Sequence, residues 1–233
     1  MKPSGLSTGC LIDVFVACLV VVNVGRDAGV AARAAVVGMN GGDSSHTPAQ
    51  LVSLDVYYET LCPDSVQFIV QQLHPTLQKV GQIMNVSLIP FGIATERKQG
   101  DSYVFTCQHG AKECRGNTIQ ACIIHLLTLT DPALPLKFIY CMERSRDPSA
   151  AGAACAIELG VEFAPIATCA STKLGNELQH VMAQRTLSLN PKLNWVPWLV
   201  LNGVHTDEIQ RKGSANLLKL ICATYQGEKP SGC

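Results

Sequence analysis

Hydrophobic and polar residues alternate in the first part of the chain that predicts regular structure. Leu51–Tyr58 follows this alternation and is rich in β-branched and aromatic residues, a pattern typical of a strand. Apolar residues then recur at helical spacing between Pro63 and Gly81, and Asn85–Pro90 predicts a second strand. The order of strand, helix and strand predicts a βαβ unit with a parallel pair of strands.

The pattern changes between residues 92 and 190. Helical spacing recurs there, with expected helices at about 117–129, 135–145, 150–160 and 170–187. Six cysteines lie in the same region. We therefore expect a helical insertion, over about 92–190, that is fastened by disulfides.

A β pattern returns near the C-terminus. Trp198–Leu201 predicts a short strand, and Asn202-Gly203 predicts a two-residue hairpin turn because both positions favour a positive φ. The partner strand is expected to begin at Val204-His205, and Asp207–Lys212 to form a connection. A last helix, capped by Ser214, is expected to end near residue 225.

The N-terminal segment has the features of a targeting sequence. Lys2 precedes an apolar run, Leu11–Val22, which only Asp13 interrupts, and small residues follow. This pattern predicts a signal peptide over residues 1–34, cut between about 24 and 38. A membrane anchor is the alternative, but the run is shorter than the roughly 20 residues that a bilayer span needs, so no stable membrane span is expected. Residues 35–49 predict a flexible leader, 50–228 the folded domain and 229–233 a C-terminal tail.

The chain holds eleven cysteines in 233 residues, a density typical of proteins that fold in an oxidising compartment. Removal of the signal peptide would remove Cys10 and Cys18 and leave nine cysteines. Because nine is odd, at least one thiol is free or bonded to another molecule. Both a monomer and a disulfide-linked dimer are compatible with this count.

Two further features bear on destination and partners. Asn85-Val86-Ser87 is an N-glycosylation sequon, so Asn85 is expected to carry a glycan in a secreted or lysosomal/endosomal protein. Basic and acidic residues balance at 18 each, and no basic stripe is visible. Nucleic acid is therefore excluded as an expected partner.

Cys62 lies between the first strand and the helix that follows. A helix N-terminus stabilises a thiolate through its dipole and its unpaired N–H groups, and the thiolate is the nucleophilic form. Asp64 opposes this effect, because a neighbouring carboxylate disfavours a second negative charge. If Cys62 is free, the other eight cysteines can form four disulfides, but a buried or bonded Cys62 stays open at this point.

Residues 107–122 contain a second motif, with the pattern CQHG, two residues, EC, two residues, N, four residues and C. Its fixed positions are Cys107, Gln108, His109, Gly110, Glu113, Cys114, Asn117 and Cys122. The motif resembles the signature of the gamma-interferon-inducible lysosomal thiol reductase family. The resemblance extends to Tyr57-Tyr58-Glu59 with Cys62 and to Val196-Pro197-Trp198, and it covers about residues 51–225.

The resemblance implies an α/β fold with a thioredoxin-like core and a disulfide-rich helical insertion. It implies a thiol reductase that acts on the disulfides of substrate proteins in the endosomal/lysosomal or extracellular space. No cofactor is implied, only an external small thiol such as cysteine or glutathione. It also implies that Val196-Pro197 forms a cis-proline loop beside the reactive cysteine, although sequence alone favours an ordinary trans proline.

Disulfides are expected in the signature rather than a metal site. The gaps of six and seven residues between its cysteines differ from the short paired spacings of zinc sites, so His109 is not expected to bind a metal. The candidates for disulfide bonds are Cys107, Cys114, Cys122, Cys141, Cys155, Cys169, Cys222 and Cys233. Their connectivity stays open at this stage.

The sequence departs from the family at the reactive site. The family uses Cys-x-x-Cys, whereas this chain has Cys62-Pro63-Asp64-Ser65. Ser65 cannot resolve a mixed disulfide, but its hydroxyl can donate a hydrogen bond to a Cys62 thiolate. Three hypotheses follow: a monothiol reductase or isomerase, a protein that traps partners as mixed disulfides, and a redox-inactive secreted binding module with a role in host defence.

Overall fold

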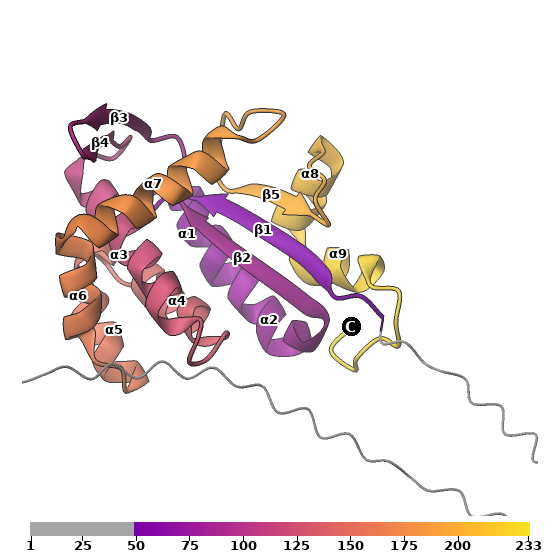
Figure 1. The fold of residues 1–233 in the computed structure, drawn as a ribbon. Coiled ribbons are helices and arrows are strands. Elements are labelled where there is room, and N and C mark those ends of the chain that lie inside the picture. The colour runs from indigo at the N-terminus through magenta and orange to yellow at the C-terminus, as the bar shows by residue number, and fades with distance from the viewer. Residues whose placement is uncertain (1–48) are drawn as a thin grey trace, which may run out of the picture. The chain divides into compact units, whose positions relative to one another are not determined.

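Three strands form the central sheet of the protein, a computed structural model of which describes residues 49–233 (Figure 1). Strands β1 (Val52–Tyr58), β2 (Met84–Pro90) and β5 (Trp198–Leu201) lie in the order β2-β1-β5. β1 and β2 run parallel, and β5 runs antiparallel to β1. The α/β class, the βαβ unit and the short third strand are thus as expected. The expected signal peptide, 1–34, and all but the last residue of the leader, 35–49, lie outside the described residues.

The helix between β1 and β2 has three parts. Helix α1 (Pro63–Phe68) continues into a π-helical turn, η1 (Ile69–Leu73), and then into α2 (His74–Val80). Pro75 lies in the first turn of α2, and because proline has no N–H it cannot continue the α-helical bonding of the preceding turn. A short 3-10 turn, η2 (Gly81–Ile83), leads into β2.

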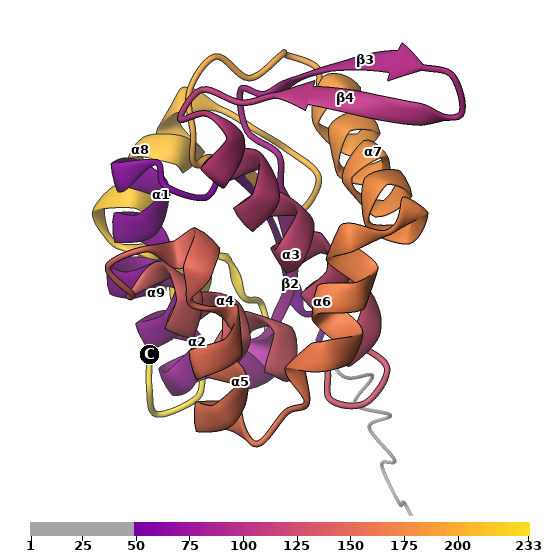
Figure 2. The same cartoon turned by 90° about the vertical axis from the view of Figure 1, so that its left-hand side faces the viewer.

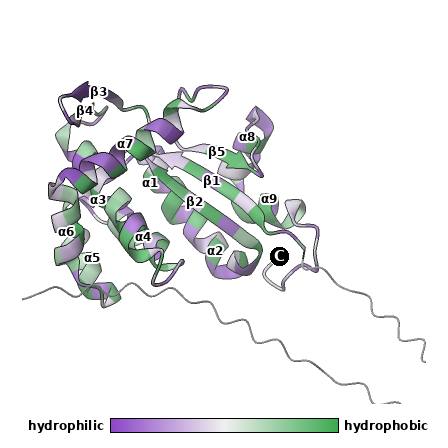
Figure 3. Ribbon diagram, viewed as in Figure 1, coloured by the Kyte–Doolittle hydropathy of each residue, from purple (hydrophilic) through white to green (hydrophobic). Residues whose placement is uncertain are grey.

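The sheet is covered on both faces. Alternate β1 residues, including Leu54 and Val56, belong to the larger core, together with Phe68 and Leu73 from the α1–η1 segment. Tyr57 faces the opposite side and lies in a second core, which also contains residues of α3 and α7. Figure 3 shows the resulting hydrophobic colour along β1 and β2.

The insertion contains most of the helices. These are α3 (Ala111–Leu127), α4 (Leu134–Glu143), η3 (Pro148–Ala150), α5 (Gly152–Leu159), α6 (Phe163–Ser171) and α7 (Lys173–Leu187). The expected helix over 170–187 corresponds to α7, whereas α6 was not expected; the chain is extended at Thr172, between the two helices. None of the helices in the described part of the chain is long and apolar enough to cross a bilayer.

The insertion also contains an antiparallel hairpin that the sequence interpretation missed. Strands β3 (Thr95–Gln99) and β4 (Ser102–Thr106) pair around Gly100-Asp101, with Gly100 at φ 60°. Figure 2 shows the hairpin beside one end of α7. The alternation of Ser102–Thr106 and the Gly-Asp turn signal were present, but the polar character of Thr95–Gln99 concealed the first strand.

The chain after β5 differs from the expectation. The Asn202-Gly203 turn is present, with φ of 50° and 79°, but only one bridge, from Leu201 to Val204, follows it, and the expected partner strand is absent from the described residues. His205 instead stacks on Trp198.

The last two helices also begin elsewhere than expected. The expected connection over 207–212 is wrong, because Asp207–Ala215 forms helix α8, capped by the hydroxyl of Thr206. Ser214 lies inside α8, and Asn216 caps α9 (Leu217–Thr224).

Four disulfides join the eight candidate cysteines. The pairs are Cys107–Cys114, Cys122–Cys169, Cys141–Cys155 and Cys222–Cys233. Three of them lie within the insertion. The fourth ties the expected C-terminal tail to α9.

Candidate functional site

Cys62 is the one free cysteine among the described residues, and it is partly exposed. It is the N-cap of α1, where its carbonyl accepts a hydrogen bond from the Val66 N–H at 3.0 Å. Pro63 occupies the first helical position, where no N–H is needed. Leu61, immediately before Cys62, has φ 74°, which is rare for a residue other than glycine and indicates a constrained backbone at this point.

Ser65 lies where the resolving cysteine of the family motif would lie, three residues after Cys62. Its side chain is fully buried, and its hydroxyl has no hydrogen-bond partner in the structure. The hydrogen bond to Cys62 that the sequence suggested is therefore not formed in this state.

The Val196-Pro197 peptide bond is cis, and both residues are buried. They line a groove of about 370 Å³ together with Asp64 and Gln67 of α1 and the exposed Trp195. The structure thus brings the proline loop, more than 130 residues later in the sequence, to the first turn of the Cys62 helix.

The signature residues on α3 hold the segment that precedes Cys62. The Asn117 side-chain oxygen accepts a hydrogen bond from the Thr60 N–H at 2.8 Å. Gly116 packs so closely that a Cβ there would lie 2.6 Å from Cγ2 of Thr60. A signature residue and its glycine neighbour therefore position the backbone two residues ahead of the thiol.

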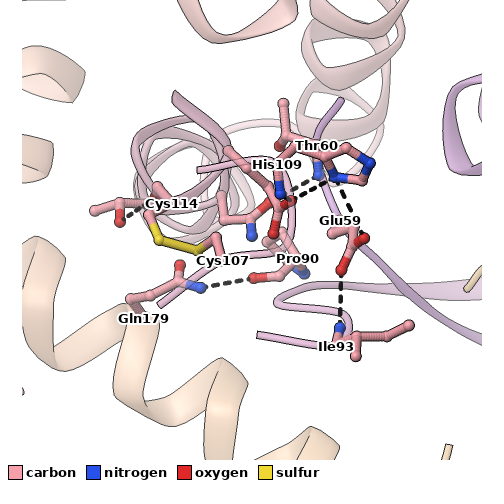
Figure 4. Close-up of a disulfide and its surroundings, with 11 residues drawn as sticks. Glu59, Thr60, Pro90, Ile93, Cys107, His109, Cys114 and Gln179 are labelled. Atoms are coloured by element: carbon pink, nitrogen blue, oxygen red, sulfur yellow. Dashed lines mark hydrogen bonds and ion pairs between the residues drawn. A yellow bond between two sulfur atoms is a disulfide. The ribbon is translucent and has the colours of Figure 1, made fainter. Parts of the chain in front are cut away.

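Two glutamate side chains and one histidine side chain meet at the start of α3. His109 Nδ1 lies 2.6 Å from Glu113 Oε2 and 3.6 Å from Glu59 Oε1. Figure 4 shows Glu59 pointing toward the imidazole, with the Cys107–Cys114 disulfide nearby. Both carboxylates are fully buried, whereas the His109 side chain is 34% exposed. Burial raises the pKa of Glu59, and the hydrogen bond from the Ile93 N–H offsets part of this effect.

The remaining signature residues lie in the loop before α3 or on α3 itself. Cys107–Cys114 closes the loop that presents His109, and Gly110 in that loop has φ 78°, which favours glycine. Gln108 is exposed and makes no side-chain hydrogen bond in the described part of the chain. Cys122 connects α3 to α6 through Cys169. Asn85 lies exposed on the edge strand β2, so glycosylation stays a prediction.

A buried polar chain that links β1, α3 and α4 was missed by the sequence analysis. Tyr58 donates its hydroxyl hydrogen to Gln120, whose amide donates to Glu143 at the end of α4. Burial raises the pKa of Glu143 to about 7, and the hydrogen bond from Gln120 opposes this shift. Glu143 also lines a groove of about 530 Å³ with Leu61 and Pro63. No local sequence signal distinguishes Glu143 from an ordinary charged residue at a helix end.

The βαβ core, the thiol at the start of α1 and the cis-proline loop at the same helix turn define a thioredoxin-like protein. A family model described as Gamma interferon inducible lysosomal thiol reductase (GILT) matches residues 53–159. The chain belongs to the gamma-interferon-inducible lysosomal thiol reductase family, and its enzyme class is that of the thiol–disulfide oxidoreductases.

Individual relatives extend the match beyond the family model. The gamma-interferon-inducible lysosomal thiol reductase of Carassius auratus is 41% identical over 190 residues, which cover 79% of this chain and 73% of the relative. The Mus musculus protein of the same name is 38% identical, with coverages of 80% and 73%. A solved structure of the oxidoreductase DsbA from Xylella fastidiosa is similar with a TM-score of 0.42 and 12% identity, over 74% of this chain and 86% of that chain.

Proposed function

We propose that this protein catalyses thiol–disulfide exchange through Cys62 alone, with an external small thiol such as cysteine or glutathione in the place of a resolving cysteine. One observation carries the proposal: Cys62 is free at a helix N-cap, while the other eight cysteines of the described chain are held in disulfides. Because Ser65 has no sulfur, the second half of the reaction needs a thiol from solution.

The reaction balances in three exchange steps for each substrate disulfide. The Cys62 thiolate attacks one sulfur of a substrate disulfide, forms a mixed disulfide and expels the other substrate sulfur as a thiolate. A small-thiol thiolate then attacks the Cys62 sulfur and expels the second substrate thiolate. A second small thiol regenerates Cys62 and leaves as the oxidised dimer of the small thiol. If a substrate thiol attacks instead, the net result is disulfide isomerisation.

The geometry around α1 supports a protein substrate. Grooves lie on both sides of the helix, one lined by Val196-Pro197 and the other by Leu61 and Glu143. Extended peptide on either side of a substrate disulfide would fit such open surfaces. Four disulfides support a place in the secretory pathway, and we propose the endosomal/lysosomal or extracellular space as the site of action.

The test is reduction of a disulfide-bonded protein at acidic pH with added small thiol, for the wild-type protein and for Cys62→Ser. Thiol-dependent turnover that falls to the uncatalysed rate in Cys62→Ser would support the monothiol mechanism. Equal, background-level rates in both proteins would contradict it and favour the redox-inactive binding module. A covalent adduct that forms on Cys62 but is not released by small thiol would instead favour the trapping hypothesis.

Ser65→Cys sharpens the test. The substitution restores two sulfurs at family spacing, so we expect faster reduction that depends less on the concentration of small thiol. Ser65→Ala is the matched control, because it changes the same buried position without supplying a thiol. A gain in both variants would show that loss of the hydroxyl, and not a resolving thiol, causes the effect.

A further inference from the structure

The structure assigns a divalent transition-metal site to Glu59, His109 and Glu113. Each of the three side chains offers one ligand atom, and the atoms all lie within 4.8 Å of one another. The residues come from the position after β1, from the loop before α3 and from the first turn of α3. A metal ion there would connect the segment that leads into Cys62 to helix α3.

The charge of the cluster favours a cation. Two buried carboxylates face one imidazole, and buried charges in proteins are paired or coordinate metals. A divalent cation between these groups compensates the charge of both carboxylates. The sequence analysis expected no metal at His109, and the cysteine spacings on which it relied do not report on Glu59, which lies fifty residues before His109.

Unsatisfied oxygen atoms point to a missing ligand. Glu59 Oε1 and Glu113 Oε1 are buried, and neither has a hydrogen-bond partner in the structure. Glu59 Oε1 is aimed into the cluster, 3.6 Å from His109 Nδ1. Buried polar atoms without partners are uncommon in folded proteins, and an ion is one of the explanations for them.

The second oxygen of each carboxylate is already held in place. Glu59 Oε2 accepts the Ile93 N–H at 2.8 Å, and Glu113 Oε2 accepts the His109 N–H at 2.7 Å. Hydrogen bonds of this kind orient metal ligands in known sites. Gly92 adds to the restraint, because a Cβ there would lie 2.1 Å from Glu59 Oε2.

The ligand set and spacing suit zinc or a similar ion. Zinc binds histidine nitrogen and carboxylate oxygen at about 2.0–2.2 Å, so tetrahedral ligands lie roughly 3.3 Å apart. The 3.6 Å separation of Glu59 Oε1 and His109 Nδ1 is close to that value. The 2.6 Å contact of His109 Nδ1 is a hydrogen bond with Glu113 Oε2, so binding of a metal ion by Nδ1 and Glu113 Oε1 requires the imidazole to leave that bond. His109 is partly exposed and can make that adjustment.

The test is titration calorimetry of the folded, disulfide-bonded protein with Zn²⁺ at pH 7. The Cys62→Ser background removes the free thiol as a competing ligand and makes the result independent of the proposed redox activity. We expect one zinc per chain, and an affinity at least about tenfold weaker in His109→Ala and in Glu113→Gln. Co²⁺ should give the visible absorption of a four-coordinate ion, lost in the same variants.

Glu96→Gln is the matched control. Glu96 Oε2 lies 2.8 Å from His180 Nδ1, so this pair repeats the histidine–glutamate contact without a second carboxylate. Zinc binding should survive Glu96→Gln unchanged. Absence of one-to-one binding, or binding that persists in His109→Ala, would overturn the proposal. If Glu113→Gln fails to fold by circular dichroism, His109→Ala decides, because His109 is partly exposed.

Discussion

The βαβ core and the insertion contribute different parts of the site. The core supplies the free thiol: Cys62 lies at the junction of β1 and α1, a place that local sequence determines. The insertion supplies the restraint: Asn117 and Gly116 on α3 contact Thr60 across more than fifty residues of sequence. Damage to the insertion would therefore leave Cys62 as a free thiol but would change the position of that thiol.

The largest expected effect comes from the disulfide between α3 and α6. Replacing both Cys122 and Cys169 with alanine removes a cross-link over 47 residues, which should lower the free energy of unfolding by about 4 kcal/mol through the entropy of the unfolded chain. Urea denaturation measures the change. Cys222→Ala with Cys233→Ala removes an 11-residue link outside the insertion and should lower the free energy of unfolding by about 3 kcal/mol. It should also slow thiol–disulfide exchange less than the loss of the Cys122–Cys169 link does. A larger rate loss in this second variant would contradict the comparison.

Glu143 should make the stability of the folded protein depend on pH. Its pKa is about 7 in the folded protein against an ordinary value of 4.5, because it is buried. The folded state therefore binds more protons between these values, so the stability from this group is complete below pH 4.5 and is lost as the pH rises to about 7. The loss amounts to about 3 kcal/mol.

The pH dependence can be tested with Glu143→Gln. Between pH 5 and pH 8, the free energy of unfolding of this variant should change by about 3 kcal/mol less than that of the wild type, as measured by urea denaturation. At pH 8 the variant should be more stable than the wild type. Glu158→Gln, which removes an exposed ion pair with Arg144, the residue after Glu143, is the control and should leave the slope unchanged. An unaltered slope in Glu143→Gln would show that another group carries the titration.

The smallest of these effects concerns the contact between the two regions. Gly116→Ala places a methyl group within 3.0 Å of three Thr60 side-chain atoms, so we expect a loss of about 1–3 kcal/mol and a slower exchange reaction. Gly81→Ala is the control, because its Cβ would meet Leu77 at an ordinary 3.5 Å and its φ is −56°. Equal exchange rates in the two variants would show that the α3 contact does not position Cys62.

Local patterns predicted the core of the fold well. Alternation identified β1, and helical spacing identified the α1–α2 segment, because these patterns reflect which face of one element is buried. The Asn202-Gly203 turn was also predictable, since it depends on two residues that tolerate positive φ. The helix α8 was missed because its cap, Thr206, was not recognised and its surface is mostly polar.

The sequence by itself determined that Cys62 begins a helix after a strand, and that a serine replaces the resolving cysteine. Only the tertiary structure decided the disulfide pairing, the burial of Ser65 and of Glu143, and the meeting of Glu59 with His109. The physical reason is range. Strand and helix signals come from neighbouring residues, whereas burial, cysteine pairing and ligand geometry depend on how distant segments pack.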